Sequence, residues 1–193
     1  KRISDLNSFV GYSVSVSGGF FQNRTGQVAK REARFNCLFC NNGTYVTPEN
    51  HPGKTIGDCV VCPSGTDKSR HAGFRACPCV SDYYRKDRFG ECFACPLQGI
   101  NCSGEYQHIL PGFWWTWDWG SVNNYQAYDK YVQNILIDDE NYDESTVKFQ
   151  GSLPKVHVCL RKESCQNVGD GINATCEFGY EGFLCSQCVA NYY

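Results

Sequence analysis

Apolar and polar side chains alternate near the start of the chain. In residues 9–21, "FVGYSVSVSGGFF", valine or tyrosine occupies every second position from Val10 to Val16, and a Gly-Gly pair follows. Alternation with period two is typical of a strand with one buried face, and paired glycines are typical of a turn. The pattern predicts a hairpin, and we assign residues 1–36 to an N-terminal hairpin or strand segment.

A helical spacing of apolar positions occurs in the middle of the chain. The side chains at this spacing are Tyr125, Tyr128, Val132, Ile135 and Leu136. They fall on one face of a helix, which predicts a short amphipathic helix over about 124–137. The acidic run "DDENYDE" at 138–144 follows directly and is unfavourable at a helix C-terminus. We interpret this run as a solvated loop rather than a calcium cage, because it lacks glycine-turned ligand spacing.

All four tryptophans lie in the stretch "PGFWWTWDWG", residues 111–120. If residues 113–119 form a strand, one of its faces is nearly all aromatic and consists of Phe113, Trp115, Trp117 and Trp119. This face is either the core of the segment, covered by the tyrosine-bearing helix, or a contact face for a neighbouring module, another chain or a sugar. Both interpretations stay open. A membrane-inserted tip lacks a supporting basic flank.

The composition favours small stapled units over one large core. The chain has 14 cysteines in 193 residues, no methionine and 15% aromatic residues, so the aromatic side chains must supply most of the apolar area. The net charge of −2 sets aside nucleic acid as a partner, since a phosphate backbone demands a basic face. The scattered histidines form no triad or metal pattern, and no phosphate loop occurs. We therefore expect neither an enzyme nor a cofactor.

Four N-x-[ST] sequons together with abundant cysteine favour the secretory pathway. The predicted glycan-bearing residues, which must face solvent, are Asn23, Asn42, Asn101 and Asn173. No apolar run approaches the roughly 20 residues that span a bilayer, so we expect no membrane insertion within this segment. The start lacks the apolar core of a signal peptide, so we expect the mature part of a secreted or cell-surface protein.

Cysteines also occur as C-x-x-C pairs, at Cys37/Cys40, Cys59/Cys62, Cys92/Cys95 and Cys185/Cys188. The first two pairs are 18 residues apart, a spacing that also suits a zinc ribbon. The cysteines are too many for one or two metal sites, and sequons interleave with the pairs. An intracellular zinc-knuckle protein is therefore the less favoured alternative.

Two segments resemble known extracellular modules. Residues 59–92, with C-x-x-C-P, C-x-C and an aromatic-aromatic-Arg sequence, resemble the cysteine-rich repeat of ephrin receptors, which is related in style to TNF-receptor repeats. "CEFGYEGFLCSQCVANYY", residues 176–193, is similar to the last loop of an EGF-like domain that continues into laminin-type spacing. In that motif Gly179 and Gly182 allow a tight two-stranded loop on which Tyr180 packs.

The resemblance implies a disulfide framework. Its firmer pairs are Cys79–Cys92, Cys95–Cys102 and Cys176–Cys185, and its less firm pairs are Cys40–Cys59 and Cys62–Cys77. Cys37, Cys159, Cys165 and Cys188 stay unassigned. Laminin-type spacing has a further cysteine after Cys188, so either Cys188 pairs inward, with Cys165 as the first choice, or the protein continues beyond this module.

Trp114 and Trp117 form W-x-x-W, which resembles the acceptor pattern for C-mannosylation in secreted modules. On the strand hypothesis Trp114 lies on the solvent side, where a hexose fits. Trp114 is therefore a candidate C-mannosylation site.

These patterns together predict a small, disulfide-rich, mostly β fold of tandem modules: a cysteine-rich part at 37–104, an aromatic and acidic insert with a short helix at 105–158, and an EGF-like part at 159–193. The predicted function is that of a non-enzymatic extracellular structural or adhesive glycoprotein. Its expected partners are other extracellular chains or neighbouring modules of the same protein. A receptor ectodomain is the alternative within the same compartment. The modules serve many different proteins, so they identify no specific partner.

Overall fold

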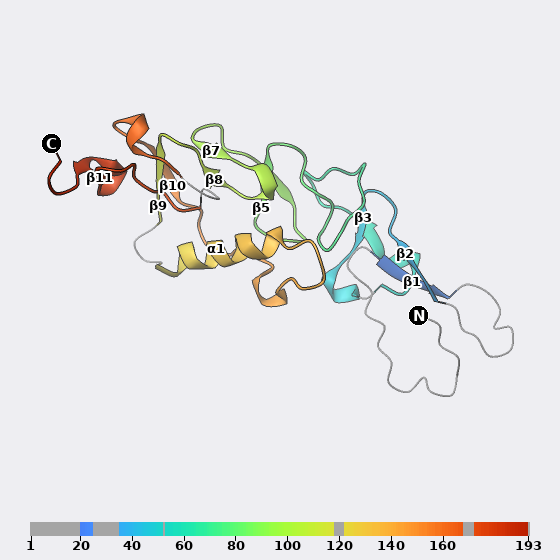
Figure 1. Ribbon diagram of the computed structural model, residues 1–193. Coiled ribbons are helices and arrows are strands. Elements are labelled where there is room, and N and C mark those ends of the chain that lie inside the picture. The colour runs from blue at the N-terminus through green and yellow to red at the C-terminus, as the bar shows by residue number, and fades with distance from the viewer. Residues whose placement is uncertain (1–19, 25–34, 52, 118–121, 168–171, 193) are drawn as a thin grey trace.

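The computed structural model describes residues 20–24, 35–51, 53–117, 122–167 and 172–192. These residues form an elongated molecule that runs from strands β1 and β2 near one end to β11 near the other (Figure 1). The hairpin predicted in residues 9–21 lies outside the described residues, except for the first two residues of β1 (Phe20–Arg24).

Short antiparallel strand pairs make up the β-structure. Within the described residues each pair is a two-stranded sheet of its own. The pairs are β1 with β2 (Phe35–Phe39), β3 (Thr44–Val46) with β4 (Cys59–Val61), β5 (Tyr83–Arg85) with β6 (Cys92–Ala94), β7 (Ile100–Asn101) with β8 (His108–Ile109), β9 (Phe113–Thr116) with β10 (Lys155–Val158), and β11 (Tyr180–Glu181) with β12 (Gln187–Cys188). An isolated two-stranded ribbon is marginal in water, so each pair depends on disulfides or on the helix for its stability.

Disulfides supply much of that support. Six bridges occur among the described residues: Cys40–Cys59, Cys62–Cys77, Cys79–Cys92, Cys95–Cys102, Cys159–Cys165 and Cys176–Cys185. Each closes a loop of short sequence separation, and such a closure stabilises a fold by about 2–4 kcal/mol through the unfolded chain. The structure therefore has the small, disulfide-rich, short-stranded character that the sequence predicts.

Cys165 and Cys188 do not pair with each other, so the predicted inward bridge between them is wrong. Cys165 is fully buried and bonded to Cys159, whereas Cys188 is a free, exposed thiol. Cys188 lies on β12, which pairs with β11. Cys37 belongs to β2, and its side chain is outside the described part of the structure.

The hydrophobic core lies under helix α1 (Val122–Leu136). The helix buries one face, which carries Tyr128, Tyr131, Val132 and Ile135. This face packs on Trp115 and Phe149, together with the buried residues of β7 and β8. The helix predicted over about 124–137 is present, beginning two residues earlier and ending one residue earlier. The boundary predicted between residues 104 and 105 passes through this shared core, since Ile100 and Cys102 belong to it.

Two buried arginines fasten the cysteine-rich part to the helix. Arg88 donates from Nη1 to the Asn134 carbonyl at 2.7 Å and from Nη2 to the Ile137 carbonyl at 2.6 Å. A guanidinium at this position neutralises the exposed carbonyls of a helix C-terminus. The positive charge of Arg88 offsets the unfavourable effect of the acidic run at 138–144 on the helix C-terminus, so the helix forms despite those negative charges.

Arg85 extends this link into the disulfide framework. Its Nη1 donates to the Arg88 carbonyl at 2.9 Å, its Nη2 donates to the Cys77 carbonyl, and its Nε lies 2.9 Å from Oε2 of Glu105. Burial lowers the pKa of Arg85 and lowers the pKa of Arg88 to about 10. The aromatic-aromatic-Arg sequence at 83–85 therefore has a structural role within the core.

Candidate interaction surface

The aromatic face predicted for the tryptophan stretch is largely core. Trp115 is only 4% exposed, and its Nε1 donates to the Ile172 carbonyl at 3.1 Å. Its ring meets Trp117 edge to face at 5.8 Å between centroids, and Phe113 and Trp117 pack against the same cluster. Trp115 has no surface left for a partner, so it is no contact residue. Trp119 lies outside the described residues.

Trp114 lies on the opposite face of β9 but does not point into open solvent. It is half-buried and packs against the sulfur cluster formed by Cys159, Cys165 and Cys185. The predicted solvent position of Trp114 is therefore corrected, because the next disulfide-linked segment covers this face. The C-mannosylation of Trp114 stays a prediction, and a hexose there would have to share space with these cysteines.

The four sequons differ in their surroundings. Asn42 is exposed, and its Nδ2 donates to the Ser69 carbonyl at 2.7 Å. Asn101 is half-buried, and its Oδ1 accepts from the Ser103 backbone at 3.0 Å. Asn173 is exposed. Asn23 lies in β1, and its side chain is outside the described part. Of the described sequons, Asn173 offers an exposed side chain that makes none of these backbone contacts.

Cysteines of the C-x-x-C pairs form disulfides with cysteines outside their own pair. Cys40 is bonded to Cys59 and Cys62 to Cys77, so these sulfurs are not thiolate ligands in this structure. No cluster of three or more histidine, cysteine, aspartate or glutamate side chains arranged to hold a metal occurs in the described ranges. The abundance of disulfides indicates an oxidising environment, of which the extracellular space is the common example.

The C-terminal hairpin supplies a different kind of site. Gly179 has φ +92° and Gly182 has φ +78°, conformations that favour glycine. A Cβ at Gly179 would lie 3.2 Å from the Tyr192 ring, so glycine also lets that ring lie against the backbone. The register pairs Tyr180 with Cys188, which places both side chains on one face of the ribbon.

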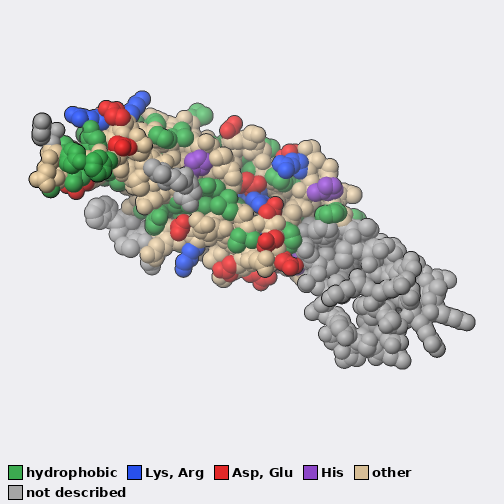
Figure 2. Space-filling model, in the orientation of Figure 1, with side chains coloured by type: hydrophobic (Ala, Val, Ile, Leu, Met, Phe, Trp, Pro, Cys, Tyr) green, Lys and Arg blue, Asp and Glu red, His purple; other side chains and the backbone are tan. Residues whose placement is uncertain are grey.

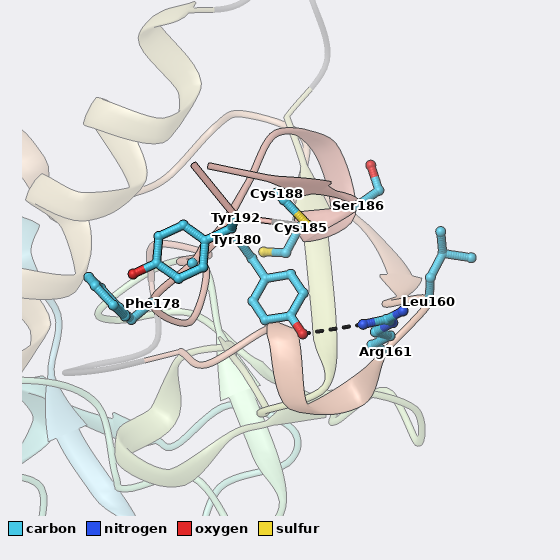
Figure 3. Close-up of a pocket in the computed structure, with 9 residues that line it drawn as sticks. Leu160, Arg161, Phe178, Tyr180, Cys185, Ser186, Cys188 and Tyr192 are labelled. Atoms are coloured by element: carbon cyan, nitrogen blue, oxygen red, sulfur yellow. Dashed lines mark hydrogen bonds between the residues drawn. The ribbon is translucent and has the colours of Figure 1, made fainter. Parts of the chain in front are cut away.

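A groove of about 550 Å³ opens beside this face (Figure 3). Its walls are formed by residues of the segments 160–161 and 178–192: Leu160, Arg161, Phe178, Gly179, Tyr180, Cys185, Ser186, Cys188 and Tyr192. The Phe178 and Tyr192 rings lie perpendicular to each other, 5.7 Å apart, at one end of the groove. We call these nine residues the C-terminal groove.

Large apolar side chains in and around this groove are strongly exposed. Phe178 is 82% exposed, Leu160 is 79% exposed and Tyr192 is about half exposed. Figure 2 shows hydrophobic side chains gathered at the end of the molecule that carries β11. Apolar side chains gathered in this way usually mark an interaction site rather than ordinary surface.

Arg161 is the charged residue of the C-terminal groove. Its Nη1 donates to the Tyr180 hydroxyl at 3.4 Å, which is the main reason that the pKa of Arg161 is raised. Among the described residues, no carboxylate lies within 4.0 Å of its guanidinium. An arginine beside exposed aromatic rings is the combination that protein interfaces favour.

Sequence patterns did not reveal this groove. Leu160, Phe178 and Tyr192 follow no helical or alternating period, and the disulfides bring them together. The sequence offered a weaker signal, because the resemblance of residues 176–193 to an EGF-like loop implied a tight two-stranded loop through Gly179 and Gly182. Such a loop has little interior, so neighbouring aromatic rings are left without cover.

Comparison with protein-family models, curated proteins and solved structures found no match for this chain. A separate search of the described residues for membrane-spanning helices found none with the necessary length and apolar character.

Proposed function

We propose that this chain is a non-enzymatic part of an extracellular structural or adhesive glycoprotein, and that it works by presenting contact surfaces to other extracellular chains or to neighbouring modules. The observation that carries this proposal is the C-terminal groove with its exposed Phe178 and Leu160. Other large aromatic groups of the chain, such as Trp115 and Tyr128, are buried. Phe178 and Tyr192, by contrast, are exposed and lie side by side at the groove.

The disulfides give such a surface a fixed shape. Cys176–Cys185 closes the loop that presents Phe178, and Cys159–Cys165 holds the segment that presents Leu160. A surface ordered before binding loses less conformational entropy on association than a flexible one. Glycans on exposed asparagines such as Asn42 and Asn173 would keep other faces solvated, which leaves the groove as the contact surface.

Site-specific photo-crosslinking tests this proposal. A photoreactive side chain is placed at Phe178 in the protein secreted by cells of its natural source, and crosslinked peptides are identified by mass spectrometry. The matched control carries the same group at Leu97, which is fully exposed but lies outside the groove. We expect crosslinks to extracellular polypeptides from position 178 and few from position 97. Equal crosslinking from both positions, or none from position 178, contradicts the proposal.

A further inference from the structure

We infer that the partner at the C-terminal groove is a second copy of this chain, bound across a two-fold axis beside β12. This inference rests on the proposed function, because it names the partner of that same surface. Three features carry it: the apolar area, the signs of the charges around the groove, and the free edge of the β11–β12 ribbon.

The exposed apolar area suits a folded partner. Phe178, Leu160 and Tyr192, which line the groove, together leave roughly 400 Å² of side-chain surface open, given about 150–250 Å² for a whole aromatic side chain. A stable protein interface takes about 800 Å² from each partner, including a polar rim. The apolar residues of the groove thus provide about half of the area that a dimer needs from each partner, and polar groups at the rim would supply the rest.

The charges near the groove can complement themselves. Among the described residues, no carboxylate lies within 4.0 Å of the Arg161 guanidinium. The carboxylate of Glu163 is farther from this guanidinium but still helps to raise the pKa of Arg161. Glu177 precedes the groove residue Phe178 in the chain. A two-fold contact brings one patch against its own copy, so a patch with charges of both signs can pair them between subunits. A patch of one sign would repel its copy.

The hairpin leaves an edge for backbone pairing. Within the described residues β12 pairs with β11 alone, and Gln187 and Cys188 are exposed. Unpaired strand edges are templates for another strand. If two β12 edges pair antiparallel in a register centred on Cys188, the two Cys188 Cα atoms lie about 4.5–5.5 Å apart. This separation falls within the usual range of about 4.4–6.8 Å for a disulfide.

Sedimentation equilibrium of the secreted full chain is the first test. We expect concentration-dependent dimers, with dissociation constants at least about tenfold higher in Phe178→Glu and Leu160→Glu. Leu97→Glu is the matched control, because it adds the same charge at an exposed leucine outside the groove. Circular dichroism and intact mass verify that each variant is folded and bridged. A wild-type chain that stays monomeric to about 1 mM overturns the inference, as does an equal effect of the control.

Oxidation by glutathione disulfide tests the position of the axis. Two Cys188 thiols lose their protons and two electrons to form one S–S bond, and one glutathione disulfide is reduced to two glutathione thiols. We expect a Cys188-linked dimer, identified by non-reducing peptide mapping, that Cys188→Ser cannot form. Phe178→Glu should slow its formation at least about fivefold, and Leu97→Glu should not. Formation at equal rates in all three proteins indicates random collision and contradicts the proposed axis.

Isotope labelling separates this inference from the function on which it rests. Heavy and light copies of the chain, mixed and crosslinked through position 178, give mixed-isotope peptides if the partner is a second copy. Crosslinks to a different protein alone overturn the second-copy inference and leave the proposed function standing. Absence of crosslinks to any protein overturns both.

Discussion

The helix-bearing core and the C-terminal hairpin use aromatic residues in opposite ways. In the core, Trp115 is buried against Tyr128 of α1, and no disulfide lies between Cys102 and Cys159. In the hairpin a disulfide fixes the loop, and Phe178 is left exposed. Packing therefore stabilises the first region and covalent bridging the second, which frees the aromatic rings of the hairpin for contact with a partner.

The largest expected effect is at the centre of the core. Trp115→Ala removes a buried ring and its hydrogen bond to Ile172, so we expect a loss of about 3–5 kcal/mol in the free energy of unfolding. Urea unfolding with the disulfides intact measures it. Trp115→Phe retains much of the apolar volume and should lose less. A loss below about 1 kcal/mol for Trp115→Ala would show that packing does not support this region.

Alkaline pH should weaken the same core. Burial raises the pKa of Tyr128 and raises that of Tyr131. The contribution of these two tyrosines to the free energy of unfolding is fully present below the ordinary tyrosine pKa near 10 and is lost as the pH rises above it. The loss is about 1.4 kcal/mol per pH unit for each tyrosine that ionises only on unfolding. Urea unfolding between pH 9 and 11.5 tests this. Tyr128→Phe should reduce the slope, and an unchanged slope would exclude Tyr128 as its source.

Removal of a bridge should affect the hairpin more locally. Replacing Cys176 and Cys185 together by alanine opens a short loop, which we expect to cost about 2–3 kcal/mol of local stability. Hydrogen exchange should accelerate in residues 177–189 and remain close to wild type in α1. Equal acceleration in both regions would show that they unfold as one unit and would remove the contrast between them.

The smallest effect is expected at the exposed ring. Phe178→Ala should change the free energy of unfolding by less than about 0.5 kcal/mol, because the ring is 82% exposed. The same urea experiment as for Trp115 applies, which makes the pair a direct comparison of a buried and an exposed aromatic residue. A loss above about 1.5 kcal/mol would assign Phe178 to the folding core and weaken its assignment to a contact surface.

Local patterns predicted the core better than the surface. The helical spacing of Tyr128, Val132 and Ile135 gave the helix and its buried face, and period two gave the shared direction of Trp115 and Trp117. The choice between core and contact face stayed open, because both interpretations bury aromatic rings.

Longer-range features could not be predicted from spacing. Arginine is usually exposed, so the complete burial of Arg85 and Arg88 depends on carbonyl groups that only the folded chain assembles. The C-terminal groove combines residues from separate segments, and its existence depends on the Cys159–Cys165 bridge, which the sequence resemblance left unassigned.

The distribution of bridges also determines how the chain would respond to a mechanical pull along its length. Residues inside a closed loop cannot be drawn out, so each bridge shortens the extension that unfolding can release. Cys102 and Cys159 are 57 positions apart with no bridge between them, and this span could lengthen to roughly 190 Å when fully extended. The aromatic core under α1 would then act as the yielding element between two covalently reinforced segments.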